Sequence, residues 1–167
     1  MTIAEFNNLN AQQAKSELMK CCGSSAWAQK IITMRPFSEL EELKELSDFA
    51  WEACTKDDYL EAFSHHPKIG NLEALEEKFA STATWASNEQ GAMKQAAAGT
   101  ISKLAEGNKL YEDKFGFIFI VCAHGKSADE MLNLLEHRLP HDLTTELRIA
   151  AAEQNKITHL RLDKLFA

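Results

Sequence analysis

The chain has 167 residues, of which 45% are apolar and 26% are charged, and its formal net charge is −7 at pH 7. These values are typical of one globular domain with a single core. The acidic balance argues against a nucleic-acid surface, no apolar run is long enough to cross a membrane, and the first residues lack a secretion signal. The four cysteines have neither metal-site nor disulfide spacing, so we expect reduced thiols in a cytoplasmic protein.

Helix start and stop signals recur through the first 66 residues, with few strand signals between them. Thr2 and Glu5 form a capping-box pattern, Gly23 is a typical helix stop, and Pro36 ends another helical stretch. After the first helix at residue 2, the predicted helices cover about residues 10–22, 24–35, 38–53 and 57–64.

The helix over residues 38–53 is predicted to begin with a second capping box, Ser38-Glu39-Leu40-Glu41. Its apolar spacing predicts an inward face composed of Leu43, Leu46, Phe49, Ala50 and Ala53. Asp57 is expected to cap the next helix, which leads the chain to His65.

The second half continues the helical pattern. Ser87-Asn88-Glu89-Gln90 has the capping-box pattern, and it begins an alanine-rich helix that we expect to end near Gly107. A turn over residues 109–114 follows. The helices predicted in this half cover about residues 72–79, 87–107, 127–139 and 143–166. Ser127 to Glu130 is expected to cap the third of these helices.

Residues 115–123 form the one strongly β-like run, and it contains no charged side chain. No second strand signal is present to pair with it. We therefore expect residues 117–123 to be a buried extended connector whose backbone groups find other partners. The predicted fold class is all-α, a single-domain helical bundle over residues 1–167 with one buried extended segment.

The stretch Ser64-His65-His66-Pro67 is the strongest candidate for chemistry. Proline disfavours the helical conformation in the residue before it, so His66 is expected to be held extended just past a helix end. An imidazole pKa near 6.5 allows exchange of a proton near neutral pH. For an isolated His-Pro pair, however, capping of the preceding helix is the commoner role.

Other candidate side chains have ordinary structural roles on the residues alone. Glu89 in a first helical turn suits the helix dipole, but it is also typical of capping. Trp85 is typical of a core position. Arg138 and Arg161 lie on apolar helices and are typical of snorkelling or salt bridging. None of these signals is specific by itself.

A set of motifs stands in a definite order along the chain: Leu9-Asn10, Gly23-Ser24-Ser25-Ala26-Trp27, His66-Pro67, Trp85 with Glu89-Gln90, Phe115-Gly116-Phe117 through Cys122, Arg138-Leu139, Lys156-Ile157 and Leu160-Arg161-Leu162. Together they resemble the OHCU decarboxylase family. Its members act on 2-oxo-4-hydroxy-4-carboxy-5-ureidoimidazoline (OHCU) in the breakdown of uric acid to (S)-allantoin. The resemblance covers nearly the whole chain, and its specificity lies in the combination and order of the motifs.

The resemblance implies that His66 is the catalytic proton donor and that Glu89 is its partner carboxylate. It also implies substrate contacts at Pro67, Ala86, Ser87, Gln90, Phe119, Ile120, Val121, Cys122, Ala123 and Arg161. Two departures from the family pattern matter. Ala86 stands where the family often has Ser, and His124 stands where many members have Arg, so each can change a substrate contact.

No cofactor and no metal is expected. The substrate has a C=N bond beside the carbon that loses CO₂, and this bond can accept the electron pair without a pyridoxal, thiamine or metal sink. A positioned general acid adds about 10²–10⁴-fold in rate and would set the chirality of the product. The resemblance further suggests a homodimer, with the small-molecule substrate OHCU and neither nucleic acid nor membrane as partner.

Three alternatives stay open at this point. The chain could decarboxylate a related ureide, or it could be a non-catalytic helical interaction domain in which the histidine pair is only a turn. A third alternative is a metal-binding protein that uses His65, His66 and Glu89. It is disfavoured because adjacent histidines usually point in different directions and no Glu-x-x-His pair supports them.

Overall fold

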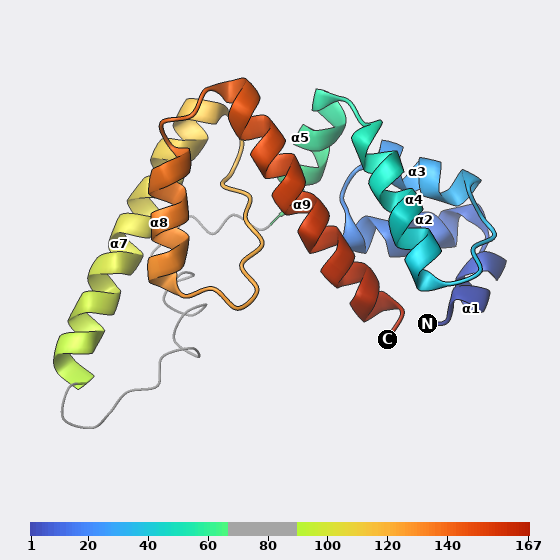
Figure 1. Ribbon diagram of the computed structural model, residues 1–167, viewed down its shortest axis with the longest axis horizontal. Coiled ribbons are helices and arrows are strands. Elements are labelled where there is room, and N and C mark those ends of the chain that lie inside the picture. The colour runs from blue at the N-terminus through green and yellow to red at the C-terminus, as the bar shows by residue number, and fades with distance from the viewer. Residues whose placement is uncertain (67–89) are drawn as a thin grey trace. The chain divides into compact units, whose positions relative to one another are not determined.

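The computed structural model describes residues 1–66 and 90–167 (Figure 1), and the side chains of residues 90–96 lie outside that description. The described residues form eight helices and no strand, so the all-α class is confirmed. Their contacts group into two compact units. One comprises residues 1–66, 120–122 and 147–167, and the other comprises residues 90–119 and 123–146. The expectation of one domain over residues 1–167 stays a prediction.

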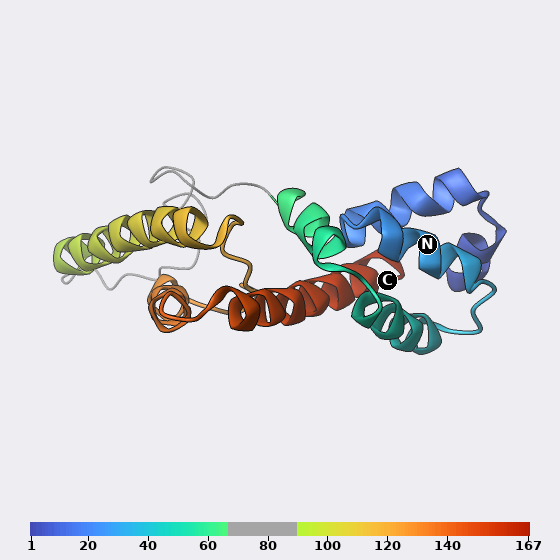
Figure 2. The same cartoon turned by 90° about the horizontal axis from the view of Figure 1, so that it is seen from above.

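The first unit contains α1 (Ile3–Asn8), α2 (Ala11–Cys21), α3 (Ser25–Thr33), α4 (Leu40–Glu52), α5 (Lys56–Ser64) and most of α9 (Leu143–Leu165). In this unit α9 lies alongside α4 and α5 (Figures 1 and 2). Trp51 of α4 donates its indole N–H to the Ala151 carbonyl of α9 at 3.0 Å. The two chain ends also meet here, because the Met1 amino group donates to the Leu165 carbonyl at 3.2 Å.

Side-chain capping explains where several helices begin. The capping boxes predicted at residues 2–5 and 127–130 are confirmed. The cap predicted for α5 is wrong, because Thr55 and not Asp57 occupies the N-cap position. Thr55 accepts from the Asp58 N–H at 3.3 Å, and the Asp58 carboxylate accepts the Thr55 N–H at 2.8 Å. This reciprocal pair starts the helix earlier than the sequence pattern suggested.

The beginning of α4 also differs from the prediction. Its N-cap is Glu39, which makes no side-chain capping bond. Ser38 instead donates both its N–H and its hydroxyl to Glu42 Oε2, each at 2.6 Å. The capping box predicted at Ser38 is therefore wrong, and a carboxylate one turn into the helix takes the donors that Ser38 presents.

Helix α4 buries only part of the face predicted for it. Leu43 and Ala50 are buried as predicted. Phe49 is 64% exposed and Ala53 is exposed, whereas Ser47 and Trp51 are buried. A polar contact accounts for the buried serine, because the Trp27 indole N–H donates to Ser47 Oγ at 3.2 Å. The tryptophans of α3 and α4 thus set the orientation of this helix, and apolar spacing alone did not indicate it.

The second unit is built on α7 (Gln90–Phe115) and α8 (Ala128–Arg138), which lie side by side (Figure 1). The prediction that the long helix ends near Gly107 is wrong. Gly107 lies where the Leu135 side chain of α8 packs against α7, and an added Cβ would collide with it. Leu104 and Tyr111 are buried on either side of this contact. The glycine therefore allows α7 and α8 to pack closely, and it does not end α7.

Residues 116–123 follow α7 without forming a helix or a strand. Phe117, Ile120 and Cys122 are buried, and the residues between them are half-buried. Within the described residues this segment pairs with no strand, so the predicted extended connector is confirmed. Its burial alternates along the segment and is less complete than we expected.

Candidate functional site

His66 lies directly after α5 in the first unit. His65 is the C-cap of that helix, and the His66 N–H donates to the Phe63 carbonyl at 3.2 Å. Glu61 of α5 accepts the backbone N–H of Ser25 at 3.0 Å and its hydroxyl at 2.7 Å. Because Ser25 begins α3, this carboxylate ties the two helices together. The last turn of α5 is therefore held firmly where it presents His66.

The two neighbouring histidines have different surroundings. His65 lies against Gly23, where an added Cβ would be 2.5 Å from the His65 Cβ. Only a residue without a Cβ fits that spacing. His66 instead contacts α9, with its Nε2 atom 2.5 Å from Gln154 Oε1. The rings thus do not share a partner, which matches the expectation that adjacent histidines point in different directions.

Gln154 and Thr158 extend the polar contact of His66 into the interior of the first unit. Gln154 Nε2 donates to Thr158 Oγ1 at 3.3 Å, and the Thr158 hydroxyl donates to the Gln154 carbonyl at 3.0 Å. Gln154 is 0% exposed and Thr158 is 2% exposed. The two residues are one helical turn apart, so they share a face of α9.

Burial is the main reason why the pKa of His66 lies below the ordinary value of 6.5. The hydrogen bond to Gln154 acts in the opposite direction, while the positive charges of Arg161 and His65 lower the pKa further. The imidazole is therefore neutral at neutral pH. A group that is half-buried and easily deprotonated is suited to proton exchange with a bound substrate.

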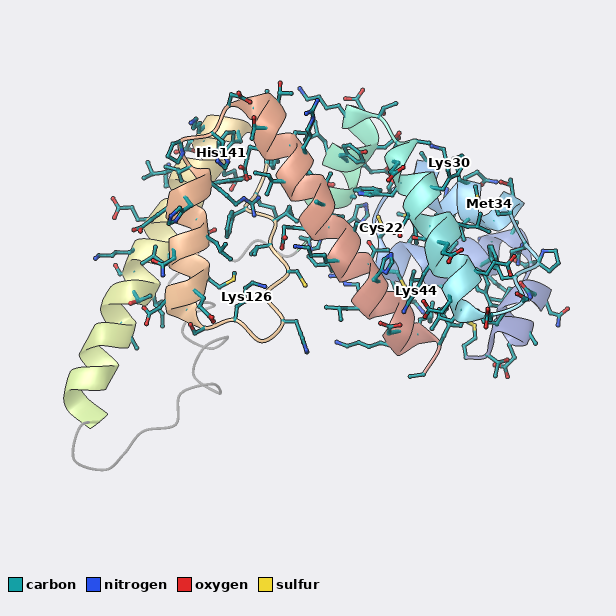
Figure 3. All side chains as sticks on the ribbon, in the orientation of Figure 1. Cys22, Lys30, Met34, Lys44, Lys126 and His141 are labelled. Atoms are coloured by element: carbon teal, nitrogen blue, oxygen red, sulfur yellow. The ribbon has the colours of Figure 1, made fainter. Side chains whose placement is uncertain are left out.

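Arg161 lies two turns after Gln154 on α9, where it affects the His66 pKa. Its Nη1 atom donates to the Cys21 carbonyl at 3.3 Å. The neighbouring thiols are poor nucleophiles, because burial raises the pKa of Cys21 to about 11 and that of Cys22, labelled in Figure 3, to about 12. All four cysteines are free, as the sequence predicted.

The extended segment, residues 116–123, also forms a hydrogen bond to α9. Of the predicted substrate contacts, Ile120, Val121 and Cys122 belong to the first unit. The Cys122 N–H donates to Glu153 Oε2 of α9 at 2.8 Å, and the Glu153 carboxylate also forms an ion pair with Lys156. A backbone N–H of the segment that pairs with no strand is thus hydrogen-bonded by a side chain, as expected for buried backbone donors.

Phe119 belongs to the second unit and packs on a buried charged cluster. The Arg138 guanidinium lies 4.5 Å from the centre of its ring. Glu146 accepts from Arg138 Nε at 2.6 Å, from Arg138 Nη2 at 2.5 Å and from the Tyr111 hydroxyl at 2.5 Å. His141, labelled in Figure 3, has its Nδ1 atom 3.0 Å from the other Glu146 oxygen. The predicted salt-bridging role of Arg138 is confirmed.

A sequence profile of the OHCU decarboxylase family matches residues 7–163. The chain belongs to this family. Every helix of the described residues is too short or too polar to cross a bilayer.

Individual relatives agree with this assignment. Over 155 residues the chain is 41% identical to the uric acid degradation bifunctional protein TTL of Arabidopsis thaliana, a match that covers 92% of this chain and 47% of that protein. It therefore spans about half of the length of that relative. Over 168 residues it is 29% identical to the 2-oxo-4-hydroxy-4-carboxy-5-ureidoimidazoline decarboxylase of Haloferax volcanii, covering 100% of this chain and 97% of the other.

A solved structure is also similar. The crystal structure of an OHCU decarboxylase in the presence of (S)-allantoin matches with a TM-score of 0.73 and 40% sequence identity. The match covers 90% of this chain and 96% of that one. The all-α class and the family membership therefore rest on independent comparisons of sequence and structure.

Several predicted site residues of this family member lie outside the described residues: Pro67, Ala86, Ser87, Glu89 and the side chain of Gln90, which begins α7. Their roles stay predictions. Sequence reasoning missed Gln154, which contacts His66 directly, and Thr158, which hydrogen-bonds to Gln154. A single glutamine within a long helix matches no motif, and only its i, i+4 relation to Thr158 hints at a pair.

Proposed function

We propose that the chain is a carboxy-lyase that converts OHCU into (S)-allantoin in uric acid degradation. The family match over residues 7–163 carries this proposal. The placement of His66 supports it, because a half-buried neutral imidazole beside α9 is suited to handling one proton.

The reaction needs one proton at a defined face of the substrate. When CO₂ leaves, the electron pair of the broken C–C bond forms a C=C bond to the adjacent carbon, and the π pair of that carbon's C=N bond moves onto the nitrogen, which takes a proton. The former C=N carbon, which carries the ureido group, then takes a proton from His66, while the hydroxyl on the carbon that lost CO₂ gives up its own proton and becomes the ring carbonyl. The substrate carboxylate, brought beside the imidazole, favours its protonated form and so loads the acid that the reaction uses.

Glu89 is the proposed partner carboxylate of His66. Pro67, Ala86, Ser87, Gln90 and residues 119–123 are the proposed substrate contacts, and all of these roles follow from the family resemblance. Arg161 is proposed to bind the substrate, because its guanidinium lies near His66 and its fork of donors suits a carboxylate.

The test is to follow chiral allantoin by circular dichroism after adding the protein to freshly generated OHCU. We expect one enantiomer to form faster than in the spontaneous reaction. A product that stays racemic, or a rate equal to the spontaneous one, would contradict the proposal. Related ureides are tested as substrates in the same assay. Their rates show whether the protein is specific for OHCU.

We further propose a cytoplasmic homodimer that uses neither metal nor cofactor. Activity should survive exhaustive chelation with EDTA, because the substrate supplies its own electron sink. Loss of turnover that a divalent ion restores would overturn this part of the proposal. Sedimentation velocity over a range of concentrations measures the oligomeric state.

A further inference from the structure

A chain of buried hydrogen bonds ends on the His66 imidazole, and its direction can be read from the inner end. The Thr158 hydroxyl has one proton, and it lies 3.0 Å from the Gln154 carbonyl, to which it donates. Thr158 Oγ1 therefore has only lone pairs left for Gln154, whose side chain contacts it at 3.3 Å. The group that Gln154 presents to Thr158 must be its NH₂ donor.

This contact determines the orientation of the Gln154 amide. If the amide were flipped, its oxygen would face Thr158 Oγ1, and no proton would remain between the two oxygens. Such a buried, unsatisfied pair would lose the hydration of both groups with no hydrogen bond in return. The amide oxygen therefore faces His66 Nε2 at 2.5 Å. Because a carbonyl oxygen only accepts, Nε2 of His66 must be the donor and must keep its proton.

We propose that Gln154, oriented by Thr158, is a positioning residue that holds His66 as its Nε2–H tautomer and thereby makes Nδ1 the nitrogen that exchanges the proton. The inference rests on the proposed catalytic role of His66 and assigns the atom through which it acts. It places Gln154 and Thr158 outside direct contact with the substrate.

This arrangement suits an imidazole that donates a proton to the substrate and later takes up another. In the imidazolium both ring nitrogens carry hydrogen, and the proton on Nδ1 passes to the substrate carbon while its bonding pair stays on Nδ1. The product is the neutral Nε2–H tautomer. The hydrogen bond to Gln154 is the same before and after this step, so the surrounding dipoles need not reorganise.

The first measurement is the tautomer itself. Nitrogen-15 NMR of labelled protein distinguishes protonated from unprotonated ring nitrogens, and His66→Asn identifies the signals of His66 among the six histidines of the chain. We expect a protonated Nε2 and an unprotonated Nδ1 above the pKa. An Nδ1–H tautomer would overturn the inference, whether or not the protein decarboxylates OHCU. Failure of the proposed function and failure of this inference are therefore observed separately.

Kinetics of matched variants provide the second measurement. Gln154→Met keeps the length of the side chain but removes the acceptor, and Thr158→Val keeps the shape but removes the hydroxyl. We expect kcat to fall roughly 10- to 100-fold in Gln154→Met and less in Thr158→Val, with little change in KM. Thr158→Ser restores the hydroxyl and should return kcat close to that of the wild type.

Asn155 provides the control, because it neighbours Gln154 on α9 but donates its amide to Asp48 Oδ1 at 2.7 Å. Asn155→Leu removes a hydrogen bond from the same helix without altering the partners of His66. We expect its kcat to be close to that of the wild type. If Gln154→Met and Thr158→Val resemble Asn155→Leu in both kcat and tautomer, Gln154 does not position His66.

A change in the pH profile separates positioning from simple packing. In the described parts of the chain, Arg161 and His65 are the charged or titratable groups that act on the His66 pKa, and both lower it. Gln154→Glu places a carboxylate at Nε2 and should raise the His66 pKa, whereas Gln154→Met should lower it. Nitrogen-15 titration measures both shifts. Equal pKa values in the two variants would contradict the contact on which the inference depends.

Discussion

Two buried polar clusters, one in each unit, differ in the way they are stabilised. In the first unit, His66 meets the uncharged side chain of Gln154 through one hydrogen bond at 2.5 Å. In the second unit, the Glu146 carboxylate is 0% exposed and is compensated by Arg138, Tyr111 and His141. The titratable group of the first cluster has an uncharged partner, whereas that of the second is surrounded by a cation and hydrogen-bond donors.

This difference indicates which cluster can move a proton. The pKa of Tyr111 is raised well above its usual range by burial and by the hydrogen bond to Glu146, so its hydroxyl keeps its proton at neutral pH. The pKa of His66 is lowered by burial, and its uncharged partner Gln154 opposes that shift only in part. The charged cluster is suited to holding the second unit together, and the neutral one is suited to chemistry.

The largest expected effect separates the two histidines of the first unit. His66→Asn should lower the rate of decarboxylation by about 10²–10⁴-fold, or about 2.7–5.5 kcal/mol of transition-state stabilisation. His65→Asn should cost far less, because that ring packs on Gly23 and not on α9. Circular dichroism of the product gives the rate, and the far-ultraviolet spectrum checks the fold. Equal and modest losses in both variants would mean that the pair is structural.

A comparable loss, this time of stability, is expected in the second unit. Arg138→Met removes the cation and leaves the Glu146 carboxylate buried, which should cost about 3–5 kcal/mol in the free energy of unfolding. In the double variant Arg138→Met with Glu146→Leu, no uncompensated charge remains, so most of that stability should return. Urea unfolding of the single and double variants measures both values. A double variant as unstable as the single one would show that the pair itself is stabilising.

Local signals predicted where several helices begin, although the cap expected at Asp57 and the capping box expected at Ser38 were wrong. The capping boxes at residues 2–5 and 127–130 depend on side chains three positions apart, and both are confirmed. The end of α7 was mispredicted because the use of Gly107 depends on Leu135 of another helix. The buried face of α4 was mispredicted in part, because Ser47 is buried by its bond to Trp27 of α3.

The same division applies to the site. His66 precedes a proline, so a local pattern pointed to it, and its role was then implied by the family resemblance. Gln154 reaches His66 only when the chain folds, since 88 positions separate them. The pairing of Arg138 with Glu146 spans a helix end and Pro140, so no periodicity predicts it. Local signals thus locate candidate residues, while the groups that tune them come from distant parts of the chain.

A smaller effect is expected at Gly23, which tests how closely the position of His66 depends on its neighbour. In Gly23→Ala the new methyl group would lie 2.5 Å from the His65 Cβ, so the end of α5 must shift. Overpacking of this kind costs about 1–3 kcal/mol of stability. The shift should also lower kcat, because His66 follows His65 directly. Wild-type kcat in a destabilised Gly23→Ala protein would show that the site tolerates movement of the turn.

The smallest expected effect is the pH dependence of stability that His66 contributes. In the unfolded chain the imidazole binds a proton near its ordinary pKa of about 6.5, whereas burial lowers this pKa in the folded protein. Between these two values the unfolded state holds more protons, so stability falls as the pH drops below about 6.5. His66→Asn should therefore lose less stability than the wild type between about pH 7.5 and pH 5. Urea unfolding at several pH values measures the difference, and parallel curves for the two proteins would mean that the His66 pKa is the same in the folded and unfolded states.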